Sequence, residues 1–191
     1  NPAAGSWDHT KQYTAAIVES CNARGLDYRV EVSKAPGECR RITREAGETG
    51  EEYRVYACGG DGTLNEVIQG CMKSKTQCPI GYIPLGSTND FARGLGIPKD
   101  PEQAVDCIIH GKDLVCDVGS FNDKYFTYVA AFGAFTEISY ETPQHFKNLL
   151  GHSAYLLNAI SKLPKIRAYR MRIEYDGGVI EDEFLYGMVT N

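Results

Sequence analysis

Residues 58–66, Cys-Gly-Gly-Asp-Gly-Thr-Leu-Asn-Glu, carry the clearest chemical signature in the chain. Gly59, Gly60 and Gly62 let the backbone approach a ligand closely, and the N-terminus of a following helix attracts an anion. A phosphate group can therefore bind here without a lysine. Thr63 and Glu66 have the spacing of a helix capping box, which predicts a helix start but does not explain the glycines.

Asp61 stands in the middle of this glycine-rich segment. A carboxylate beside a polyphosphate is repelled unless a metal ion or a set of hydrogen bonds holds it in place. Mg²⁺ is commonly bound by one or two carboxylates together with substrate phosphates. A structural aspartate that accepts hydrogen bonds from loop amides explains the residue equally well. Both interpretations stay open at this point.

A second turn of the same kind follows at residues 84–93, Pro-Leu-Gly-Ser-Thr-Asn-Asp-Phe-Ala-Arg. Ser87 and Asp90 again have capping-box spacing, and Gly86 precedes the hydroxyl. Two helix N-termini are thus expected to face one crevice at the carboxyl ends of parallel strands, where open α/β sheets bind ligands. The chain contains no Gly-x-x-x-x-Gly-Lys-Ser/Thr motif, which excludes a P-loop enzyme.

The elements that must position these turns alternate between strand and helix. Hydrophobic periodicity predicts helices over residues 10–23, 37–47, 64–72, 88–95 and 101–110, and strands over residues 26–32, 55–58 and 80–84. Short apolar strands that alternate with helices are typical of an α/β fold with a mainly parallel sheet and helices on both faces.

The pattern changes near residue 114. Strands are predicted over 115–118 and 125–131 around a turn at 122–124, and helices over 143–150 and 153–163. Alternation over 169–175, followed by Asp176-Gly177-Gly178 and a strand over 179–189, predicts a half-buried antiparallel hairpin. We therefore expect two domains, residues 1–113 and residues 114–191.

The composition sets limits on the function. The chain has 191 residues, 42% of them hydrophobic and 24% charged, so it can fold around a core. Its net charge of −5 argues against non-specific nucleic-acid binding. No apolar run approaches the ~20 residues of a membrane-spanning helix. Seven cysteines without a Cys-x-x-Cys pair favour reduced thiols and a cytoplasmic protein.

Three segments in the same order, Asn-Pro-x-x-Gly at residues 1–5 and the two turns at 59–66 and 84–93, resemble the diacylglycerol kinase catalytic domain. Bacterial lipid kinases, eukaryotic diacylglycerol kinases and sphingosine kinases share this domain. The resemblance extends through residues 117–119, 133–135 and 151–155. It implies an ATP-binding α/β domain, similar to NAD kinases and phosphofructokinases at the glycine loop, followed by a β-sandwich domain, with the active site between them.

The resemblance also implies roles for particular residues. Asp61 is expected to be catalytic and to bind Mg²⁺ or belong to a Mg²⁺-linked network. Ser33 and Ser87 stand where the family usually has threonine, and both keep the hydroxyl. The nucleotide-binding residues implied by the motifs are Asn1, Pro2, Ala3, Ala4, Gly5, Ser33, Gly59, Gly60, Asp61, Gly62, Thr63, Leu64, Asn65 and Ser87. The family's general base is expected beyond Asn191, so the predicted β-sandwich is truncated at its C-terminus.

The function implied is an ATP-dependent lipid kinase that transfers the γ-phosphoryl group to a lipid hydroxyl, with diacylglycerol as acceptor and phosphatidate as product. The alternatives are a kinase for a sphingoid base, a polyprenol or NAD, and a nucleotide-binding fragment without catalysis. Cytoplasmic location with peripheral attachment to the inner membrane face is expected, and homodimerisation is left open. A basic cluster at Lys162, Lys165, Arg167, Arg170 and Arg172 is either a membrane contact or an ordinary solvated face.

Overall fold

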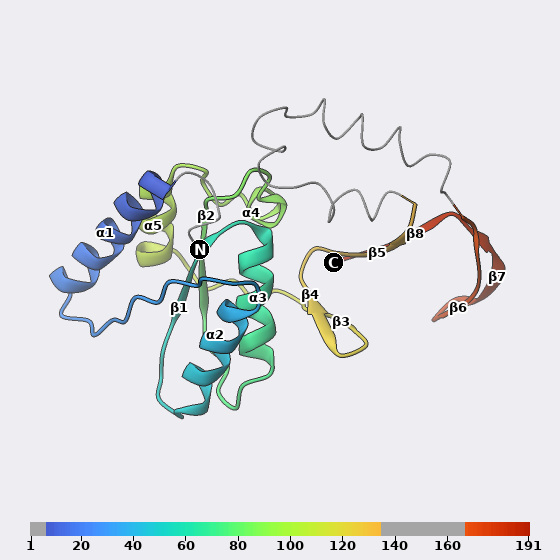
Figure 1. The fold of residues 1–191 in the computed structure, drawn as a ribbon, viewed down its shortest axis with the longest axis horizontal. Helices are drawn as coiled ribbons and strands as arrows, with labels where there is room; N and C mark the ends of the chain where they lie inside the picture. Colours follow the sequence, from blue (N-terminus) through green and yellow to red (C-terminus); the bar gives the residue numbers. More distant parts are fainter. Residues whose placement is uncertain (1–6, 135–166) are drawn as a thin grey trace. The chain divides into compact units, whose positions relative to one another are not determined.

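The computed structural model of the protein describes residues 7–134 and 167–191 (Figure 1). Its contacts divide the chain into two units, one that extends to Tyr128 and one from Val129 to Asn191. We describe each unit by itself. The domain boundary expected at residue 113 stays a prediction, because a division by contacts does not test where an independently folding domain ends.

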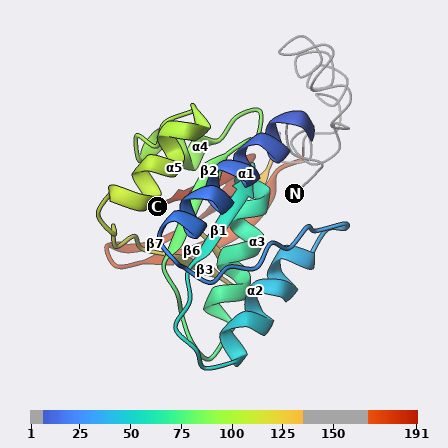
Figure 2. The same ribbon diagram turned by 90° about the vertical axis from the view of Figure 1, so that its left-hand side faces the viewer.

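The first unit places a pair of parallel strands between helices. β1 and β2 pair with Val55 opposite Ile80 and Gly59 opposite Pro84. The α2 and α3 helices lie on one side of this pair, and α5 with α1 lies on the other (Figures 1 and 2). The elements are α1 (Trp7–Ala23), α2 (Glu38–Glu48), β1 (Val55–Gly59), α3 (Asp61–Met72), β2 (Ile80–Pro84), α4 (Asp90–Gly94), α5 (Pro101–His110), β3 (Gly119–Phe121) and β4 (Lys124–Phe126).

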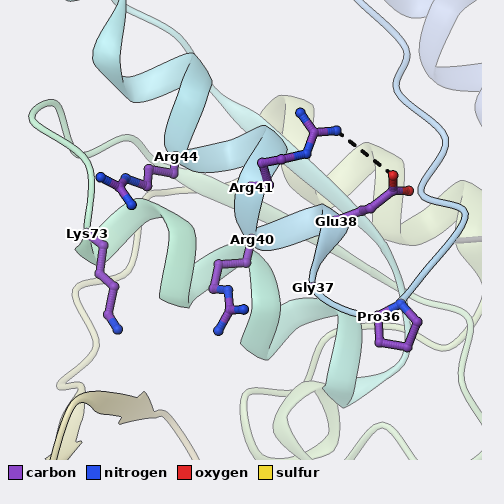
Figure 3. A pocket seen from close by; sticks show the side chains of 7 residues that line it. All are labelled: Pro36, Gly37, Glu38, Arg40, Arg41, Arg44 and Lys73. Carbon is purple, nitrogen blue, oxygen red and sulfur yellow. Dashed lines mark ion pairs between the residues drawn. The ribbon is translucent and has the colours of Figure 1, made fainter.

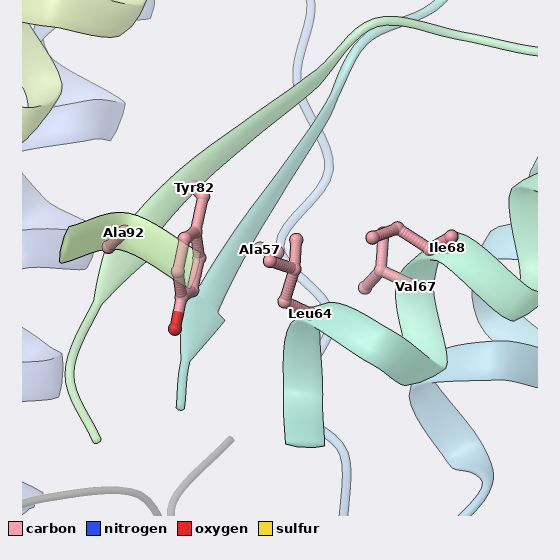
Figure 4. Close-up of a cluster of buried hydrophobic side chains, with 6 residues drawn as sticks. All are labelled: Ala57, Leu64, Val67, Ile68, Tyr82 and Ala92. Carbon is pink, nitrogen blue, oxygen red and sulfur yellow. The ribbon is translucent and has the colours of Figure 1, made fainter. Parts of the chain in front are cut away.

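The core of this unit lies where α3 and α4 cover the two strands. Its buried cluster consists of Ala57, Leu64, Val67, Ile68, Tyr82 and Ala92 (Figure 4). Leu64 and Val67 come from the first turns of α3, so burial of their side chains fixes the start of that helix against β1. The glycine-rich turn between β1 and α3 is therefore anchored at both ends.

Two glycines allow the helices to come close to their neighbours. A Cβ on Gly70 of α3 would lie 2.4 Å from the carbonyl oxygen of Arg40 in α2. A Cβ on Gly81 of β2 would lie 3.0 Å from the side chain of Ile108 in α5. Alanine at either position would push a helix away from its packing partner, because interiors leave no room for an extra methyl group.

Tyr53 gives the first unit an alkaline sensitivity that can be measured. Burial raises its pKa to about 12, and its hydroxyl donates to the carbonyl of Thr76 at 3.1 Å. The unfolded chain loses this proton near the ordinary value of about 10, whereas the folded chain keeps it. The protonated Tyr53 side chain therefore contributes its full share to the stability of the fold below pH ~10, and this share is lost as the pH rises toward ~12.

We expect Tyr53→Phe to lose less stability than the wild type between pH ~10 and ~12. Urea unfolding at a series of alkaline pH values measures the difference. Tyr28→Phe is the matched control, because Tyr28 is 47% exposed. If the free energy of unfolding falls equally with pH in Tyr53→Phe and the wild type, then Tyr53 does not contribute to the alkaline loss of stability.

The strand predicted over residues 26–32 is absent from the structure. The alternation of this segment predicts a strand, yet it is not a strand, and no described strand pairs with it. Leu26, Tyr28, Val30 and Val32 are each about half exposed, at 53%, 47%, 50% and 48%. Alternation specifies only which side chains share a face, and a strand also needs a neighbour to accept and donate its backbone hydrogen bonds.

The hairpin predicted after residue 114 begins later than expected. Val115 is 96% exposed, and the paired strands are β3 and β4, with Asn122 at a left-handed φ of 55° in the turn between them. Residues 129–131, which we expected to continue the same hairpin, instead belong to β5 (Val129–Gly133) in the second unit. The predicted turn is confirmed, but the strands around it are shorter.

The second unit contains two antiparallel pairs. β6 (Tyr169–Tyr175) and β7 (Gly178–Phe184) form the predicted hairpin, and β5 (Val129–Gly133) pairs with β8 (Tyr186–Thr190). The single strand predicted over 179–189 is thus divided at Leu185, because its two halves pair with different partners. The hairpin is also more exposed than the predicted half-buried face, with Val179 at 52% and Ile180 at 44%.

Some predictions fall outside the described residues. They include the segment at residues 1–5, the helices over 143–150 and 153–163, and Lys162 and Lys165 of the basic cluster. Within the described part of that cluster, Arg170 lies 3.6 Å from Glu181 and Arg172 lies 2.8 Å from Glu174. Among the described helices, none combines the length and the apolar character required to cross a bilayer.

Candidate nucleotide-binding site

Two strand-to-helix turns leave the same edge of the parallel pair. β1 ends at Gly59 and β2 at Pro84, and these residues are opposite each other in the register. The amide of Leu85 donates to the carbonyl of Gly59 at 2.8 Å, which ties the two strand ends together. The expectation that both turns lie in one place is therefore confirmed.

The backbones of the two turns touch through glycine. A Cβ on Gly86 would lie 2.6 Å from the Cα of Gly60, and a Cβ on Gly60 would lie 3.2 Å from the Cα of Gly86. Gly59 is equally constrained, because its Cβ would lie 2.4 Å from Oγ1 of Thr63. Close packing thus explains both Gly59 and Gly60.

Gly62 is different. A Cβ at this position would meet nothing within 4 Å, and its φ is not in the left-handed region. Alanine would also favour the helix, since glycine in a helix is less stable than alanine by about 1 kcal/mol. The fold therefore gives no reason for glycine at residue 62, which is exposed in the first turn of α3.

Asp61 connects the two turns. Its Oδ2 accepts a hydrogen bond from the amide of Asp90 at 2.9 Å, and its Oδ1 accepts one from the amide of Phe91 at 3.2 Å. These amides belong to the first turn of α4, so the carboxylate caps that helix and lies at the positive end of its dipole. The hydrogen-bonded aspartate, one of the two interpretations left open by the sequence, is thus confirmed.

The capping box proposed for Ser87 and Asp90 is wrong. α4 begins at Asp90, and its N-cap is Asn89, which has a left-handed φ of 54° and makes no capping hydrogen bond with its side chain. Asn89 instead accepts from the Gly86 amide at 2.9 Å and donates to the Gly86 carbonyl at 2.7 Å. Its side chain thereby fixes the second turn, while Asp61 supplies the cap from another helix.

The capping box proposed for Thr63 and Glu66 is also wrong. α3 begins at Asp61 with Gly60 as its N-cap, so Thr63 lies inside the first turn and is buried. Glu66 accepts from the amides of Gly37 at 2.8 Å and Cys39 at 3.2 Å, and so it caps the start of α2. Sequence reasoning missed this role. The signal for it is the N-cap residue of α2, Gly37, which has no side chain to satisfy the amides of its own helix.

The surroundings of the turns keep neighbouring groups protonated. Burial, and then the negative charge of Asp61, raise the pKa of Tyr82, whose hydroxyl donates to Asn89 Oδ1 at 3.3 Å. Burial also raises the pKa of the Cys58 thiol to about 11. A thiol in this state is a poor nucleophile.

The predicted nucleotide-binding residues differ in accessibility. Residues 1–5 lie outside the described part of the chain. Gly62, Asn65 and Ser87 are exposed around the two turns. Leu64 is 2% exposed and belongs to the core, so only its backbone is placed near the turn. The predicted residues that are buried are Ser33, Gly59, Thr63 and Leu64.

The described residues contain no group of three or more His, Cys, Asp or Glu side chains that could hold a metal ion. Asp61 is accompanied at the turn by backbone amides and by Asn89. The arrangement thus consists of glycine backbone, two helix starts and one carboxylate that accepts amide hydrogen bonds.

Comparison with known proteins decides the family. The family model of the diacylglycerol kinase catalytic domain matches residues 1–121. The chain belongs to the diacylglycerol kinase catalytic domain family. The match includes the first segment at residues 1–5 and both turns. Of these motifs, the structure brings together the two turns, at Gly60 and Gly86.

Relatives in this family are similar over almost the whole chain. The diacylglycerol kinase of Bacillus subtilis strain 168 is 35% identical over 191 residues, which are 100% of this chain and 62% of that protein. The diacylglycerol kinase of Staphylococcus aureus strain bovine RF122 / ET3-1 is 37% identical over 186 residues, which are 97% of this chain and 58% of that protein.

Solved structures of diacylglycerol kinases are also similar to this chain. A crystal structure of a diacylglycerol kinase from Bacillus anthracis strain Sterne matches with a TM-score of 0.75 and 28% identity. The match covers 100% of this chain and 62% of that protein. The chain therefore has a mixed α/β fold similar to that diacylglycerol kinase, and it spans about three fifths of the length of its relatives.

Proposed function

We propose that this chain is the nucleotide-binding part of an ATP-dependent lipid kinase, and that residues 59–65 and Ser87 bind the phosphates of ATP. The observation that carries the proposal is Gly62. It is exposed at the start of α3, and the fold itself leaves space for a side chain there. A backbone that must lie against a phosphate accounts for a glycine that packing does not require.

Asp61 fits this proposal because its charge is already compensated. Both of its oxygens accept amide hydrogen bonds from the positive end of α4. The carboxylate therefore fixes the position of the second turn without a free negative charge beside the nucleotide. Its proposed role is to hold Ser87 and the first turn of α3 in one arrangement around the phosphates.

Mg²⁺ fits the residues present if it arrives with the nucleotide. It usually keeps several waters and takes one or two carboxylates plus phosphate oxygens. Each Asp61 oxygen retains a further lone pair beyond its amide bond, so Asp61 can hold a hydrated ion. The ion would neutralise charge on the transferred phosphoryl group, and the chain's amides would position that group.

The acceptor proposed is the free hydroxyl of diacylglycerol, with phosphatidate as product. Support comes from the relatives in Bacillus subtilis and Staphylococcus aureus, which carry the name diacylglycerol kinase. We place the general base outside the residues of this chain, and we assign residues 1–113 to an α/β domain with a mainly parallel sheet and residues 114–191 to part of a β-sandwich. Attachment to the inner membrane face gives access to the lipid.

Gly62→Ala tests the phosphate site directly. We expect ATP affinity to fall by roughly tenfold or more, because a methyl group would separate the first turn of α3 from a phosphate by more than hydrogen-bond length. The free energy of unfolding should stay the same or rise by up to about 1 kcal/mol. Titration calorimetry with Mg·ATP and urea unfolding give the two measurements.

Gly94→Ala is the control for this change. Gly94 ends α4, and its added Cβ would also meet nothing within 4 Å. It should leave ATP affinity unchanged. If Gly62→Ala binds ATP as tightly as Gly94→Ala, then residues 59–65 do not hold the phosphates.

A phosphoryl-transfer assay distinguishes the remaining functions. The full-length protein is incubated with γ-labelled ATP and vesicles that contain diacylglycerol, a sphingoid base or a polyprenol. We expect labelled phosphatidate. Label in another lipid would identify a different acceptor, and ATP binding without any labelled lipid would favour a nucleotide-binding module.

A further inference from the structure

A basic pocket lies along α2, away from the two glycine turns. It has a volume of about 550 Å³ and is lined by Pro36, Gly37, Glu38, Arg40, Arg41, Arg44 and Lys73 (Figure 3). The cationic side chains come from two helical segments, since the arginines belong to α2 and Lys73 is the C-cap of α3. Four cations thus line the pocket together with one carboxylate.

Most of this positive charge is not compensated by the protein. Arg41 is the exception, because it lies 2.7 Å from Glu45 and 4.0 Å from Glu38. Among the described residues, no carboxylate lies within ion-pair distance of Arg40, Arg44 or Lys73. Arg40 and Arg44 are one helical turn apart, where like charges repel each other. An anion in the pocket would relieve that repulsion.

The packing of α2 on α3 brings these cations together. Gly70 lets the backbone of α2 approach α3 at Arg40 and Thr43, where a Cβ would lie 2.4 Å and 2.8 Å from their atoms. Lys73 follows Gly70 by about one helical turn, so the same close contact places it beside the arginines. The cation cluster is therefore built on two closely packed helices, α2 and α3.

The Lys73 side of the pocket lies at the other end of α3 from the glycine turn. The glycine turn is at the N-terminus of α3, whereas Lys73 is at its C-terminus. Lys73 is twelve positions after Asp61, which corresponds to about 18 Å along the helix axis. A phosphate bound between Asp61 and Ser87 does not fill the space beside Lys73.

We propose that this pocket is a second anion site, which binds a phosphate group through Arg40, Arg44 and Lys73. Arginine presents a planar set of N–H donors that matches two phosphate oxygens, and lysine adds a compact positive charge. The phosphate belongs either to a soluble compound or to the headgroup of an anionic lipid. Both sources supply the same chemistry, and they are separated by experiment.

The test compares Arg40→Glu/Arg44→Glu with Lys99→Glu/Lys112→Glu in the full-length protein. Both double variants change the net charge equally, and Lys99 and Lys112 are exposed residues outside the pocket. One arm titrates pyrophosphate by calorimetry, and the other measures sedimentation with phosphatidylglycerol and phosphatidylcholine vesicles. Gly62→Ala is present in every variant, so binding at the glycine turns is weakened equally in all of them and does not produce a difference between the two double variants.

We expect the pocket variant to lose binding by roughly tenfold or more and the control to keep it. Loss in the pyrophosphate arm assigns a soluble phosphate, and loss only with phosphatidylglycerol vesicles assigns a lipid headgroup. Equal binding by both double variants, or no binding by their common parent, overturns the proposal. Thermal unfolding of both variants verifies that the helices remain folded. The result is independent of whether ATP binds at the glycine turns.

Discussion

Asp61→Ala is expected to abolish phosphatidate formation by the full-length protein and to destabilise the first unit. The substitution removes both acceptors of the Asp90 and Phe91 amides, at 2.9 Å and 3.2 Å. Hydrogen bonds to a charged group contribute about 1.5–3 kcal/mol each, and unpaired amides at a helix start add a further cost. We expect a loss of about 3 kcal/mol in unfolding free energy and of at least about a hundredfold in kcat/KM.

Asp27→Ala is the matched control, because Asp27 is exposed in the segment before α2. Its stability should change by no more than about 0.5 kcal/mol. Asp61→Asn then separates the roles of geometry and charge. An amide oxygen can accept only one of the two bonds, since the NH₂ group would face the other donor.

We therefore expect Asp61→Asn to recover part of the stability and little of the activity. Urea unfolding and a labelled-ATP assay on the same preparations provide both quantities. Wild-type turnover in Asp61→Ala would contradict the proposed site, whereas normal stability with lost turnover would show that Asp61 acts on the nucleotide or its metal ion rather than on α4.

Gly86→Ala is expected to have the second large effect. Its Cβ would lie 2.6 Å from the Cα of Gly60 and 2.7 Å from Oδ1 of Asn89. The Gly60 atom is backbone and cannot rotate away, so the two turns must separate. Overpacking of this kind typically costs 1–3 kcal/mol, so with the Asn89 bonds strained we expect a loss of about 3 kcal/mol.

The same separation should weaken ATP binding, because Ser87 would move away from the first turn of α3. Circular dichroism during urea unfolding and titration with Mg·ATP measure the two effects. Gly94→Ala again serves as the control, since the same methyl group enters open space there. Normal stability of Gly86→Ala would mean that the contact between the turns does not hold them together.

Much of the site was accessible from the sequence. The order of motifs around Gly59 and Gly86 identified the family, and the periodicity between them located β1, α3 and β2 to within a few residues. These features depend on local backbone preferences. Glycine tolerates close approach, and apolar spacing specifies which helix face is buried, whatever the rest of the chain does.

Capping roles could not be read from local spacing. Thr63 with Glu66 and Ser87 with Asp90 have the capping-box pattern, but the carboxylates that cap α2 and α4 are Glu66 and Asp61 of α3. A helix start needs acceptors for its amides, and any group that the fold brings close can supply them. Spacing along the chain does not determine which group that is.

The segment over residues 26–32 shows the same limit for strands. Its alternation is a property of the sequence, whereas a strand forms only where a neighbour completes its hydrogen bonds. The basic pocket along α2 also depends on tertiary structure, because close packing at Gly70 brings Lys73 of α3 beside Arg40 and Arg44. The sequence by itself determined the family, the glycine turns and the elements β1, α3 and β2 around them. Only the tertiary structure decided which partners the polar groups have, because those partners come from distant parts of the chain.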